Sequence, residues 1–537
     1  MCGIAGIVNF NNQPAEEARI QQMMDVIKHR GPDDEGTYVH RNFGLGHVRL
    51  SILDLSSAGH QPMFSNDKRF CIVFNGEIYN YIELKEELKA KYNFVTRTDT
   101  EVILAAYQEW GSACLNRFNG DFSFVIYDHQ THEFFGARDR YGIKPFYYYK
   151  DNDKLIFASE IKSIIPLTPN KRRNNKLVFE YLVYNKTDQS NETFFEEIFK
   201  LPHGHYFTIK NNQFNIHRWY SLSEKVKNIA LVQPEEYRQA LLSSVRLRLR
   251  SDVPVGVSLS GGIDSSTIAS LIIDDLGQKD LHTFSATYGK DKWADESNFI
   301  DEYQDRIKNM HFTQPDADDF FSDFKDFIYA QGEPVASIGP YAQYKVMQLA
   351  QKNVKVTLDG QGADEQLAGY HNFFGSYFRE LLAQARWGTL AAEMAAYIKM
   401  HKSLYAIKYL GFYLLPSGFK KNVGSKLFGN INKTFFNETR SLSTIDKQLY
   451  DPKTLNESLL DHFEFKLEHL LKWDDLNSMR FSIESRVPFL DHNLVELTLS
   501  LKPGQKIYRG TTKYILRESV KDILPHKIYA RVDKNPS

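Results

Sequence analysis

The pattern of apolar and polar residues along the chain changes character near residue 222. Before that point, short runs rich in β-branched and aromatic residues alternate with turn-rich pieces such as 29–36 and 128–133, a pattern that predicts β-strands. The predicted strands are GIAGIVNF (3–10), FGLGHVRLSIL (43–53), RFCIVFNG (69–76), FSFVIYD (122–128) and FFGARD (134–139).

Helical spacing of apolar residues interrupts these strands in three places. One stretch, from about 15 to 28, carries Ile20, Met23 and Ile27 at helical spacing, and a second runs from about 99 to 110. A shorter stretch covers about 81–90. A region dominated by strands with a few helices favours sheets that are covered by helices.

Beyond residue 222 strands and helices alternate, which predicts a parallel sheet built from βαβ units. From about 371 to 475 the sequence is rich in aromatic residues and mostly helical, and we interpret its aromatic stripes as core packing in preference to a partner face. The predicted helices of the alternating region are 235–249, 266–276 and 296–307, and its predicted strands are 253–259, 281–288 and 353–360.

Composition and charge narrow the class of protein. The chain has 537 residues, with 66 Lys+Arg against 67 Asp+Glu, and 42% of its residues are hydrophobic, which suits two or three domains with sizeable cores. The near-zero net charge argues against a nucleic-acid binder, and no apolar run reaches the ~18–20 residues of a membrane span. The N-terminus lacks the basic region of a signal peptide, and three cysteines are too few for a disulfide framework, so we expect a cytoplasmic protein.

Cys2 stands directly after the initiator methionine. Removal of Met1 makes it the N-terminal residue, which then carries a thiol nucleophile and an α-amine that can act as the adjacent base. Position alone favours a simpler interpretation, a small apolar residue at the start of a strand. The residues that follow it decide between the two.

Several polar residues downstream suit a free amino acid as substrate. Arg49 is a bidentate donor for an α-carboxylate, and Asp99 can bind an α-ammonium. Asn75 and Gly76, in a turn at a strand end, can form an oxyanion hole for a thioester-forming attack. Each also has an ordinary structural explanation, because Asn-Gly is a common hairpin turn and Asp99 can be a helix N-cap.

Together these residues form motifs that resemble the glutaminase domain of class II glutamine amidotransferases, a family with an N-terminal cysteine nucleophile. MCGIAG, HRGPD, RLSI, NGEIYN, TDTEV and GARDRYGIKPFYY occur in the family's order. The resemblance implies a domain over residues 2–220, folded as an α+β N-terminal-nucleophile sandwich with α/β/β/α layers. It implies Cys2 as the catalytic nucleophile, Asn75 and Gly76 as the oxyanion hole, and a glutamine site of Arg49, Asn75, Gly76, Glu77 and Asp99. Cys71 and Cys114 match no family role, and we interpret them as packing.

A glycine-rich loop, SGGIDSS from Ser260 to Ser266, connects the predicted strand 253–259 to the helix that follows. Backbone N–H groups and a helix N-terminus suit an anion, the serines add hydroxyl donors, and Asp264 can hold Mg²⁺ on a phosphate. The loop lacks the lysine of the ordinary phosphate-binding loop. It resembles instead the loop of ATP pyrophosphatases, which cleave ATP to AMP and pyrophosphate, and a purely structural Gly-Gly turn is the disfavoured alternative.

A second candidate loop, DGQGADE from Asp359 to Glu365, follows the predicted strand 353–360. Acidic residues at the carboxyl end of a parallel strand are well placed for a metal, although a cluster of helix N-cap residues is the ordinary alternative. Further on, ESRVPFLD (484–491) and KYILRE (513–518) are expected in helical or turn context, where each alone would pass as a solvated or salt-bridged face.

In this order the motifs resemble those of the glutamine-hydrolysing asparagine synthetases, and the resemblance spans nearly the whole chain. It implies an α/β parallel-sheet ATP-pyrophosphatase domain over residues 235–537, with a helical insertion at about 371–475. It also implies that Asp264 and Asp364 bind Mg²⁺ and that Lys513 steadies the phosphates during adenylation. The implied ATP contacts are Leu259, Ser260, Gly261, Gly262, Asp264, Ser265, Ser266, Ala286, Asp359 and Gly360.

The resemblance implies a reaction as well. Ammonia released from glutamine amidates L-aspartate, which ATP has activated as β-aspartyl-AMP, and ammonia travels inside the protein between the sites. The expected partners are the small molecules glutamine, aspartate and ATP, with Mg²⁺ as cofactor and without nucleic acid or membrane. A homodimer is an assembly that the sequence leaves open.

Two departures from the family pattern keep other functions open. Gln361 stands where family members often carry Glu, and the basic segment that begins at Arg531 ends at Ser537, where the family usually continues through a Gly-Phe. Three alternatives remain: an amidotransferase that acts on another carboxylate, a tRNA-modifying ATP pyrophosphatase and a non-enzymatic relative. The balanced charge and the complete glutaminase half count against the second.

Overall fold

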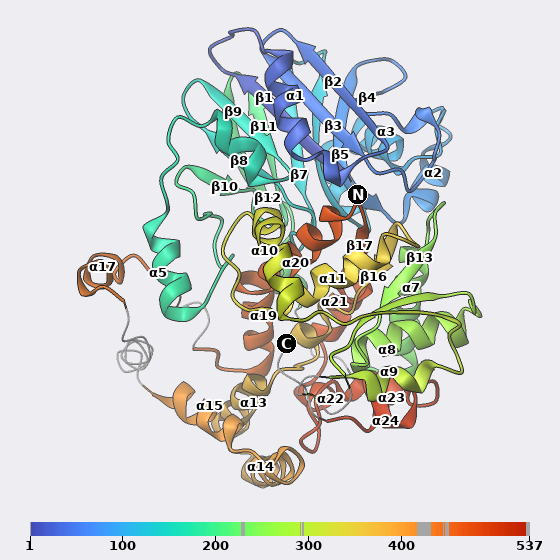
Figure 1. Cartoon of the computed structure of the whole chain (residues 1–537), viewed down its shortest axis with the longest axis vertical. Helices are drawn as coiled ribbons and strands as arrows, with labels where there is room; N and C mark the ends of the chain where they lie inside the picture. Colours follow the sequence, from blue (N-terminus) through green and yellow to red (C-terminus); the bar gives the residue numbers. More distant parts are fainter. Residues whose placement is uncertain are drawn as a thin grey trace.

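The computed structural model describes residues 2–226, 231–289, 292, 295–415, 431–443, 445 and 451–532. Its first part contains two six-stranded antiparallel sheets that pack face to face (Figure 1). The first sheet has the order β10-β8-β9-β1-β3-β2, and the second has the order β12-β11-β7-β6-β5-β4. The strands of the first are β1 (Gly3–Asn9), β2 (Asp34–His40), β3 (Phe43–Arg49), β8 (Tyr147–Lys150), β9 (Lys154–Ala158) and β10 (Ile198–Lys200). Those of the second are β4 (Met63–Phe64), β5 (Phe70–Ile78), β6 (Gly120–Asp128), β7 (Glu133–Arg138), β11 (His205–Lys210) and β12 (Gln213–Arg218).

Helices cover the outer faces of both sheets. α1 (Glu17–Val26) packs its buried apolar face on the first sheet, with α4 (Ile161–Ile164) beside it. α2 (Tyr81–Leu88) and α3 (Asp99–Trp110) pack on the second sheet. Cys71 belongs to the core between the sheets and Cys114 to the core under α3, so both cysteines are packing residues. The prediction of an α/β/β/α sandwich is confirmed.

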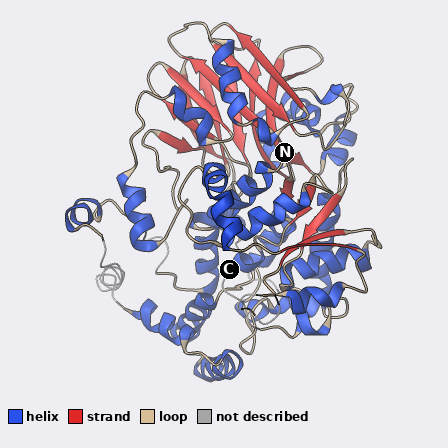
Figure 2. Ribbon diagram, in the orientation of Figure 1, coloured by secondary structure: helices blue, strands red, loops and turns tan. Residues whose placement is uncertain are grey.

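The second part is built on a five-stranded sheet of order β15-β14-β13-β16-β17, in which every neighbouring pair is parallel. This confirms the predicted α/β architecture, and Figure 2 shows this smaller group of strands below the sandwich. Its strands are β13 (Val255–Ser258), β14 (His282–Ala286), β15 (Asn309–Thr313), β16 (Val356–Leu358) and β17 (Glu484–Arg486). The helices packed on or near it are α7 (Pro234–Arg248), α8 (Ile263–Ser270), α9 (Ser297–Ile300), α10 (Ala317–Gln331), α11 (Gly339–Ala350), α12 (Ala363–Gln366), α21 (His492–Leu499), α22 (Pro503–Lys506), α23 (Tyr514–Val520) and α24 (His526–Tyr529).

The predicted helical insertion is mostly helical where the structure describes it, with turns and short irregular links between its helices. The aromatic stripe of α13 (His371–Ala383), which includes Phe373, Phe374 and Phe378, is fully buried in a core shared with neighbouring helices, as the packing interpretation predicts. Residues 416–430, 444 and 446–450 of this region lie outside the described part of the chain. The other helices here are α14 (Trp387–His401), α15 (Tyr405–Leu414), α17 (Lys433–Thr439), α19 (Leu455–Phe465) and α20 (Leu467–Arg480), while α5 (Asn175–Tyr184) and α6 (Leu222–Lys225) precede the parallel sheet.

Two local predictions are wrong. The helix expected over 296–307 is only α9 followed by one 3₁₀ turn, Asp301–Tyr303, because Tyr303 turns inward and its hydroxyl donates to Ser266 O at 2.9 Å. Glu484 to Arg486 form the strand β17 and are buried, where we expected a solvated helical or turn segment. The sequence pattern does not predict β17 because its three residues are all polar and show no alternation of apolar and polar positions. Their partners come from distant parts of the chain.

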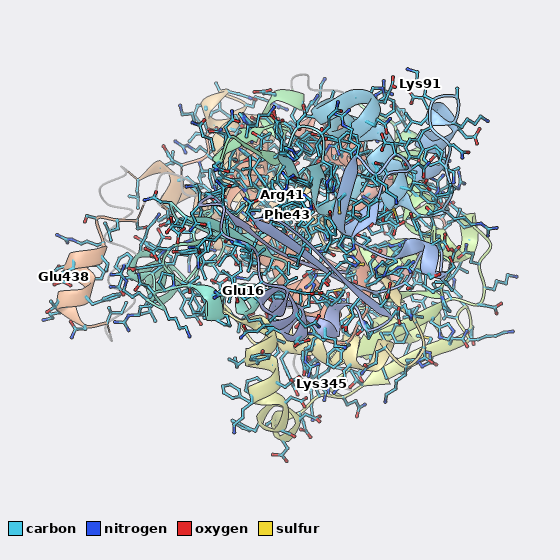
Figure 3. The ribbon with its side chains drawn as sticks, turned by 90° about the horizontal axis from the view of Figure 1, so that it is seen from above. Glu16, Arg41, Phe43, Lys91, Lys345 and Glu438 are labelled. Carbon is cyan, nitrogen blue, oxygen red and sulfur yellow. The ribbon has the colours of Figure 1, made fainter. Side chains whose placement is uncertain are left out.

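Many charged side chains lie on the outer surface and many apolar ones in the interior. Seen from above, Lys91 and Glu438 lie at the edges of the molecule, while the buried Phe43 lies near its middle (Figure 3). Within the described residues, no helix is both long and apolar enough to cross a membrane.

Candidate active sites

Cys2 immediately precedes β1, the strand between β9 and β3 in the first sheet. Its backbone N donates to Asn75 Oδ1 at 3.0 Å, and its carbonyl accepts from Arg30 Nε at 3.0 Å. Cys2 is buried, and this burial raises the pKa of its thiol. Because the thiolate is the reactive form, a nucleophilic Cys2 needs a base beside it.

Asn75 and Gly76 lie in β5, which pairs with β6 along its whole length. Asn75 is fully buried, and its Nδ2 has no hydrogen-bond partner among the described residues. Gly76 has a φ of +152°, and a Cβ there would lie 2.2 Å from Asp121 O, so only glycine fits. A buried N–H donor without a partner, close to the Cys2 backbone, is what an oxyanion hole requires.

Glu77 and Asp99 bring two carboxyl groups close enough to act on one another electrostatically. Glu77 follows Gly76 in β5, is buried, and has an Oε1 without a hydrogen-bond partner in the described part of the chain. Asp99 begins α3, whose N-cap is Thr98, and its Oδ2 accepts from Ile78 N at 2.8 Å. Burial raises the pKa of Asp99 to about 7, and burial together with the Asp99 charge raises the pKa of Glu77. A bound ammonium group would favour the ionised form of both carboxyls.

Arg49 ends β3 and is held by the loop that follows. Its Nη1 donates to Ser56 O at 2.8 Å, and its Nη2 donates to Asp54 O at 2.5 Å. Gly59 leaves room for the guanidinium, because a Cβ there would lie 1.9 Å from Arg49 Nη2. Arg49 therefore shapes this loop, and its contact with a substrate carboxylate stays a prediction.

The glycine-rich loop joins β13 to α8, as the sequence predicts. Its turn passes through Gly261, which has a φ of +70°. The hydroxyls of Ser260 and Ser265 lie 3.1 Å apart, and Ser260 N donates to Ser265 Oγ at 3.1 Å. Ser266 is buried, and its Oγ has no hydrogen-bond partner among the described residues. A phosphate that takes the hydroxyls of Ser260 and Ser265 must replace their mutual hydrogen bond.

Lys513 joins the two acidic residues that the sequence predicts as metal ligands. Its Nζ lies 2.7 and 2.6 Å from the two carboxylate oxygens of Asp264 and 2.7 Å from Asp364 Oδ1. Burial lowers the pKa of Lys513, but the two carboxylates outweigh burial and raise it. Gly369 makes room for this group, because a Cβ there would lie 1.8 Å from Asp364 Oδ1. Two carboxylates that share one positive charge are a donor set that fits a hard divalent cation.

Asp359 and Gly360 lie at the carboxyl edge of the parallel sheet, directly after β16. Asp359 Oδ2 accepts from Thr357 Oγ1 at 3.1 Å and from Ser485 Oγ at 2.9 Å. Gly360 packs tightly on the glycine-rich loop, because a Cβ there would lie 2.9 Å from Asp264 Cβ. The two loops predicted to bind ATP therefore meet in space.

The structure gives fewer relevant contacts for two of the residues that the sequence predicts to bind ATP. Leu259 has its side chain in the core, and its N donates to Phe284 O at 2.9 Å. Ala286 is the last residue of β14, at the same edge of the sheet as the glycine-rich loop. The contacts of both residues with ATP stay predictions.

Sequence reasoning missed a set of charged residues buried where the two parts of the chain meet. Arg30 is fully buried, and its two terminal nitrogens lie 2.8 and 3.1 Å from the carboxylate oxygens of Asp475 in α20. The same guanidinium also holds the Cys2 carbonyl. The HRGPD motif marked Arg30, but no local signal pointed to a partner 445 residues away along the chain.

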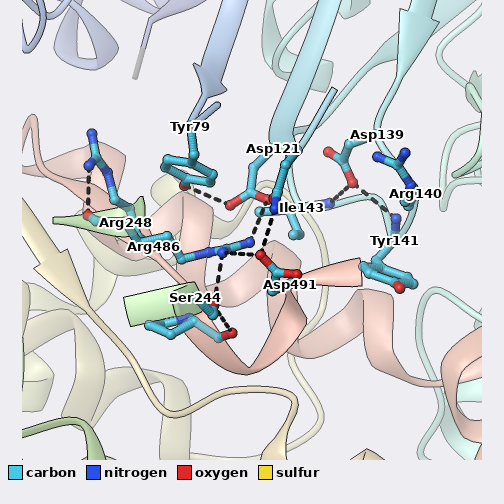
Figure 4. A network of polar contacts seen from close by, with 12 residues as sticks. Tyr79, Asp121, Asp139, Arg140, Tyr141, Ile143, Ser244, Arg248, Arg486 and Asp491 are labelled. Carbon is cyan, nitrogen blue, oxygen red and sulfur yellow. Dashed lines mark hydrogen bonds and ion pairs between the residues drawn. The ribbon is translucent and has the colours of Figure 1, made fainter. Parts of the chain in front are cut away.

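A second buried group of this kind joins Tyr79, directly after β5, and Asp121 in β6 to α7 and the 484–491 segment. Arg248 Nη1 lies 3.1 Å from Asp491 Oδ2, and the hydroxyl of Tyr79 donates to Asp121 Oδ2 at 2.9 Å (Figure 4). The guanidinium of Arg248 stacks 4.6 Å from the ring centre of Tyr79. Residues from both halves thus form one buried polar network.

Comparison with known proteins finds two family patterns, which match successive parts of the chain. The pattern that defines the glutamine amidotransferase domain matches residues 1–220, and the pattern that defines the asparagine synthase domain matches residues 236–536. The fold and the two matches define an enzyme in which a glutamine amidotransferase is joined to an asparagine synthase domain.

Similar proteins cover the chain almost from end to end. Asparagine synthetase [glutamine-hydrolyzing] 1 of Bacillus subtilis is 32% identical, over 99% of this chain and 86% of that protein. A putative asparagine synthetase of Methanocaldococcus jannaschii is 35% identical over 85% of this chain and 90% of that protein. Amidase chyE of Penicillium rubens is 29% identical over 98% of this chain and 87% of that protein. The chain belongs to the asparagine synthase family, and this membership implies that it uses glutamine and ATP.

Proposed function

We propose that the protein converts L-aspartate to L-asparagine with ammonia from glutamine, and that ATP is cleaved to AMP and pyrophosphate. In this proposal residues 2–220 form the glutaminase domain, and residues 235–537 form the synthetase domain with its insertion at about 371–475. The observation that carries the glutaminase half is the pairing of Cys2 N with Asn75 Oδ1, which leaves the buried Asn75 Nδ2 without a partner among the described residues.

In the first half-reaction Cys2 Sγ attacks the side-chain carbonyl carbon of glutamine. Once Met1 is removed, the α-amine of Cys2 takes the thiol proton, which offsets the raised pKa of the buried thiol. Asn75 Nδ2 and the Gly76 N–H donate to the oxyanion that forms on the carbonyl oxygen. Ammonia leaves as the thioester forms, and water then releases glutamate. Glu77 and Asp99 hold the α-ammonium of glutamine, and Arg49 binds its α-carboxylate.

In the second half-reaction the aspartate side-chain carboxylate attacks the α-phosphorus of ATP, and pyrophosphate leaves. Ammonia then attacks the carbonyl carbon of β-aspartyl-AMP and displaces AMP. The residues assigned to ATP are Ser260 to Ser266 with Asp359 and Gly360, and Lys513 steadies the phosphates. Asp264 and Asp364 would hold Mg²⁺, which supplies positive charge for the phosphate oxygens when bound.

Ammonia must reach the acyl-adenylate before water does. Two small cavities lie between the halves, and each is lined by residues of both. Asp121 and Arg248 line the first, and Arg138 and Asp475 line the second. Their position supports passage of ammonia inside the protein.

Gln361 favours a second proposal, in which the acceptor is a carboxylate other than aspartate. Gln361 is neutral and cannot accept a proton from attacking ammonia, whereas the Glu that family members often carry there can. The similarity to an amidase at 29% identity, close to that of the synthetases, supports the same alternative. In this second proposal the two domains amidate a different carboxylate of a biosynthetic pathway.

One experiment separates the two proposals. The protein is incubated with ATP, Mg²⁺ and glutamine labelled with ¹⁵N in its amide, and each of a panel of carboxylates is added in turn. Aspartate-dependent formation of AMP and labelled asparagine supports the first proposal. AMP formation that depends on another carboxylate and not on aspartate supports the second.

A further inference from the structure

β17 is only three residues long, and its side chains alternate between two predicted sites. Successive side chains of a strand point to opposite faces of the sheet. Ser485 Oγ donates to Asp359 Oδ2 in the ATP site, whereas Arg486 lies 3.5 Å from Glu77 in the glutamine pocket. β17 pairs in parallel with β16, so it belongs to the synthetase sheet although Arg486 faces the glutaminase half.

The guanidinium of Arg486 is fixed on every side except the one that faces Glu77. Its Nη1 donates to Arg248 O and to Arg250 O, each at 2.7 Å, and its Nε donates to Glu484 Oε1 at 2.5 Å. The ring centre of Tyr79 lies 5.3 Å from its central carbon (Figure 4). Nη2 is the end that remains, and Glu77 Oε2 lies 3.5 Å from it.

Glu77 depends on this neighbour because both residues are buried and few other charges compensate it. Arg486 is fully buried and Glu77 is 3% exposed. Glu77 Oε1 has no hydrogen-bond partner among the described residues, so one carboxylate oxygen faces Arg486 and the other is available to a ligand. Asp99 and Glu484 act on Glu77 as like charges, and Arg486 opposes them.

We infer that Arg486 is a positioning residue of the glutamine pocket, supplied by the synthetase sheet, which holds Glu77 in the orientation that receives the α-ammonium of glutamine. The inference rests on the proposed glutaminase reaction. It means that the glutamine pocket is complete only when the two halves are docked.

The test is Arg486→Lys with Ser485→Ala as the matched control on the same strand. Lysine keeps the positive charge but cannot hold two carbonyls and Glu77 at once, because it lacks the rigid fork of arginine. We expect Arg486→Lys to raise KM for glutamine by about tenfold or more, since a small misplacement of a binding group has effects of this size. Ammonia-dependent AMP formation should stay within about twofold of wild type, because Arg486 contacts Asp359 through its backbone carbonyl, which accepts from Asp359 N at 2.8 Å and is unchanged in the lysine variant.

Ser485→Ala should show the opposite pattern. It removes a hydrogen bond to Asp359 and should raise KM for ATP, while KM for glutamine stays at the wild-type value. If one variant changes only KM for glutamine and the other changes only KM for ATP, a general loss of structure cannot explain the two effects, because the residues are neighbours in one short strand. A wild-type protein that does not hydrolyse glutamine at all would refute the proposed function itself, before either variant is compared.

Two outcomes would overturn the inference. One is an unchanged KM for glutamine in Arg486→Lys, and the other is an equal loss of both activities in both variants. If Arg486→Lys does not fold, Glu484→Gln serves as the second variant, because it removes the charged acceptor of Arg486 Nε and keeps the size of the side chain. We expect KM for glutamine to rise in Glu484→Gln as well, and an unchanged KM there would also overturn the inference.

Discussion

The proposed glutamine pocket and the proposed ATP site differ in how their polar groups are satisfied. In the glutamine pocket, Asn75 Nδ2 and Glu77 Oε1 are buried without hydrogen-bond partners among the described residues. In the ATP site the charged groups already pair with one another, because Lys513 bridges Asp264 and Asp364. A ligand that enters the first gains Asn75 Nδ2 and Glu77 Oε1 as partners that are already placed. A phosphate or cation that enters the second also meets the hydroxyl of Ser266, which has no partner in the described part of the chain, but it must replace the ion pairs of Lys513.

This difference indicates two kinds of site in one chain. The glutamine pocket is preorganised by a strand whose position is fixed between neighbours in an antiparallel sheet. The ATP site rests in a self-paired arrangement that must open when phosphates and a cation arrive. Variants that affect only one site should therefore separate the two activities.

Cys2→Ala should have the largest effect, and it should affect only the glutamine-dependent activity. It should abolish glutamine-dependent turnover, by at least about 10³-fold, because no other group takes the role of the nucleophile. Ammonia-dependent turnover should stay largely intact, since the adenylation site is separate. Glutamate release and AMP formation are measured side by side, and normal glutamine hydrolysis in the variant would place the nucleophile elsewhere.

Lys513→Gln should affect the proposed ATP site and leave the proposed glutamine pocket unchanged. Loss of the ammonium removes the positive charge that lies between the carboxylates of Asp264 and Asp364, which should lower the free energy of unfolding by about 3 kcal/mol or more when measured in EDTA. AMP formation should fall by about 10²-fold or more, because the phosphates lose their cation. Arg238→Lys is the control for an ordinary ion pair, because Arg238 lies on α7 and pairs with Asp275. Equal denaturation midpoints for Lys513→Gln and wild type would contradict the self-paired arrangement.

The pH dependence of glutamine binding sharpens the comparison. Burial raises the pKa of Asp99 to about 7, so its carboxyl is ionised above that pH and protonated below it. The α-ammonium of glutamine binds the ionised form, so KM for glutamine should rise about tenfold as the pH falls from 8 to 6. Asp99→Asn should have a high KM that changes less over this range than that of the wild type, because only Glu77 then titrates beside the ammonium. A flat profile in the wild type would show that Asp99 does not bind the ammonium.

Gln361→Glu should have the smallest effect. If the protein makes asparagine with Gln361 in place, another group accepts the proton from ammonia or none is needed, and the variant should change the rate by less than about threefold. Asparagine formed per minute and acceptor-dependent pyrophosphate exchange are compared for the two proteins. A large gain of asparagine synthesis in the variant would indicate that the natural Gln361 directs the enzyme to another carboxylate.

The sequence predicted most of the fold because the two halves carry two different apolar periods. The strands around Cys2 and Asn75 and the alternation after residue 222 are read directly from such periods, and the strands of all three sheets include the segments that these periods predict. The motif residues also come together in space: Cys2 meets Asn75, and Asp264 meets Asp364 through Lys513.

The contacts between the halves could not be predicted in this way. Arg486 and Glu77 are 409 positions apart, as 486 − 77 gives, and each alone is compatible with a solvated salt bridge. A charged residue is buried only when its partners are placed by the tertiary fold, so no local period marks it. The strand β17 was missed for this reason, and it carries the residues that join the two sites.

The central claim is that one chain moves the amide nitrogen of glutamine to the aspartate side chain at the expense of ATP. The most direct test is mass spectrometry of the products from amide-¹⁵N glutamine, ATP, Mg²⁺ and L-aspartate. The account predicts labelled asparagine, glutamate, AMP and pyrophosphate in equal amounts, with labelled asparagine absent from the Cys2→Ala reaction. Formation of ADP and inorganic phosphate, or AMP formation that does not respond to aspartate, would contradict it.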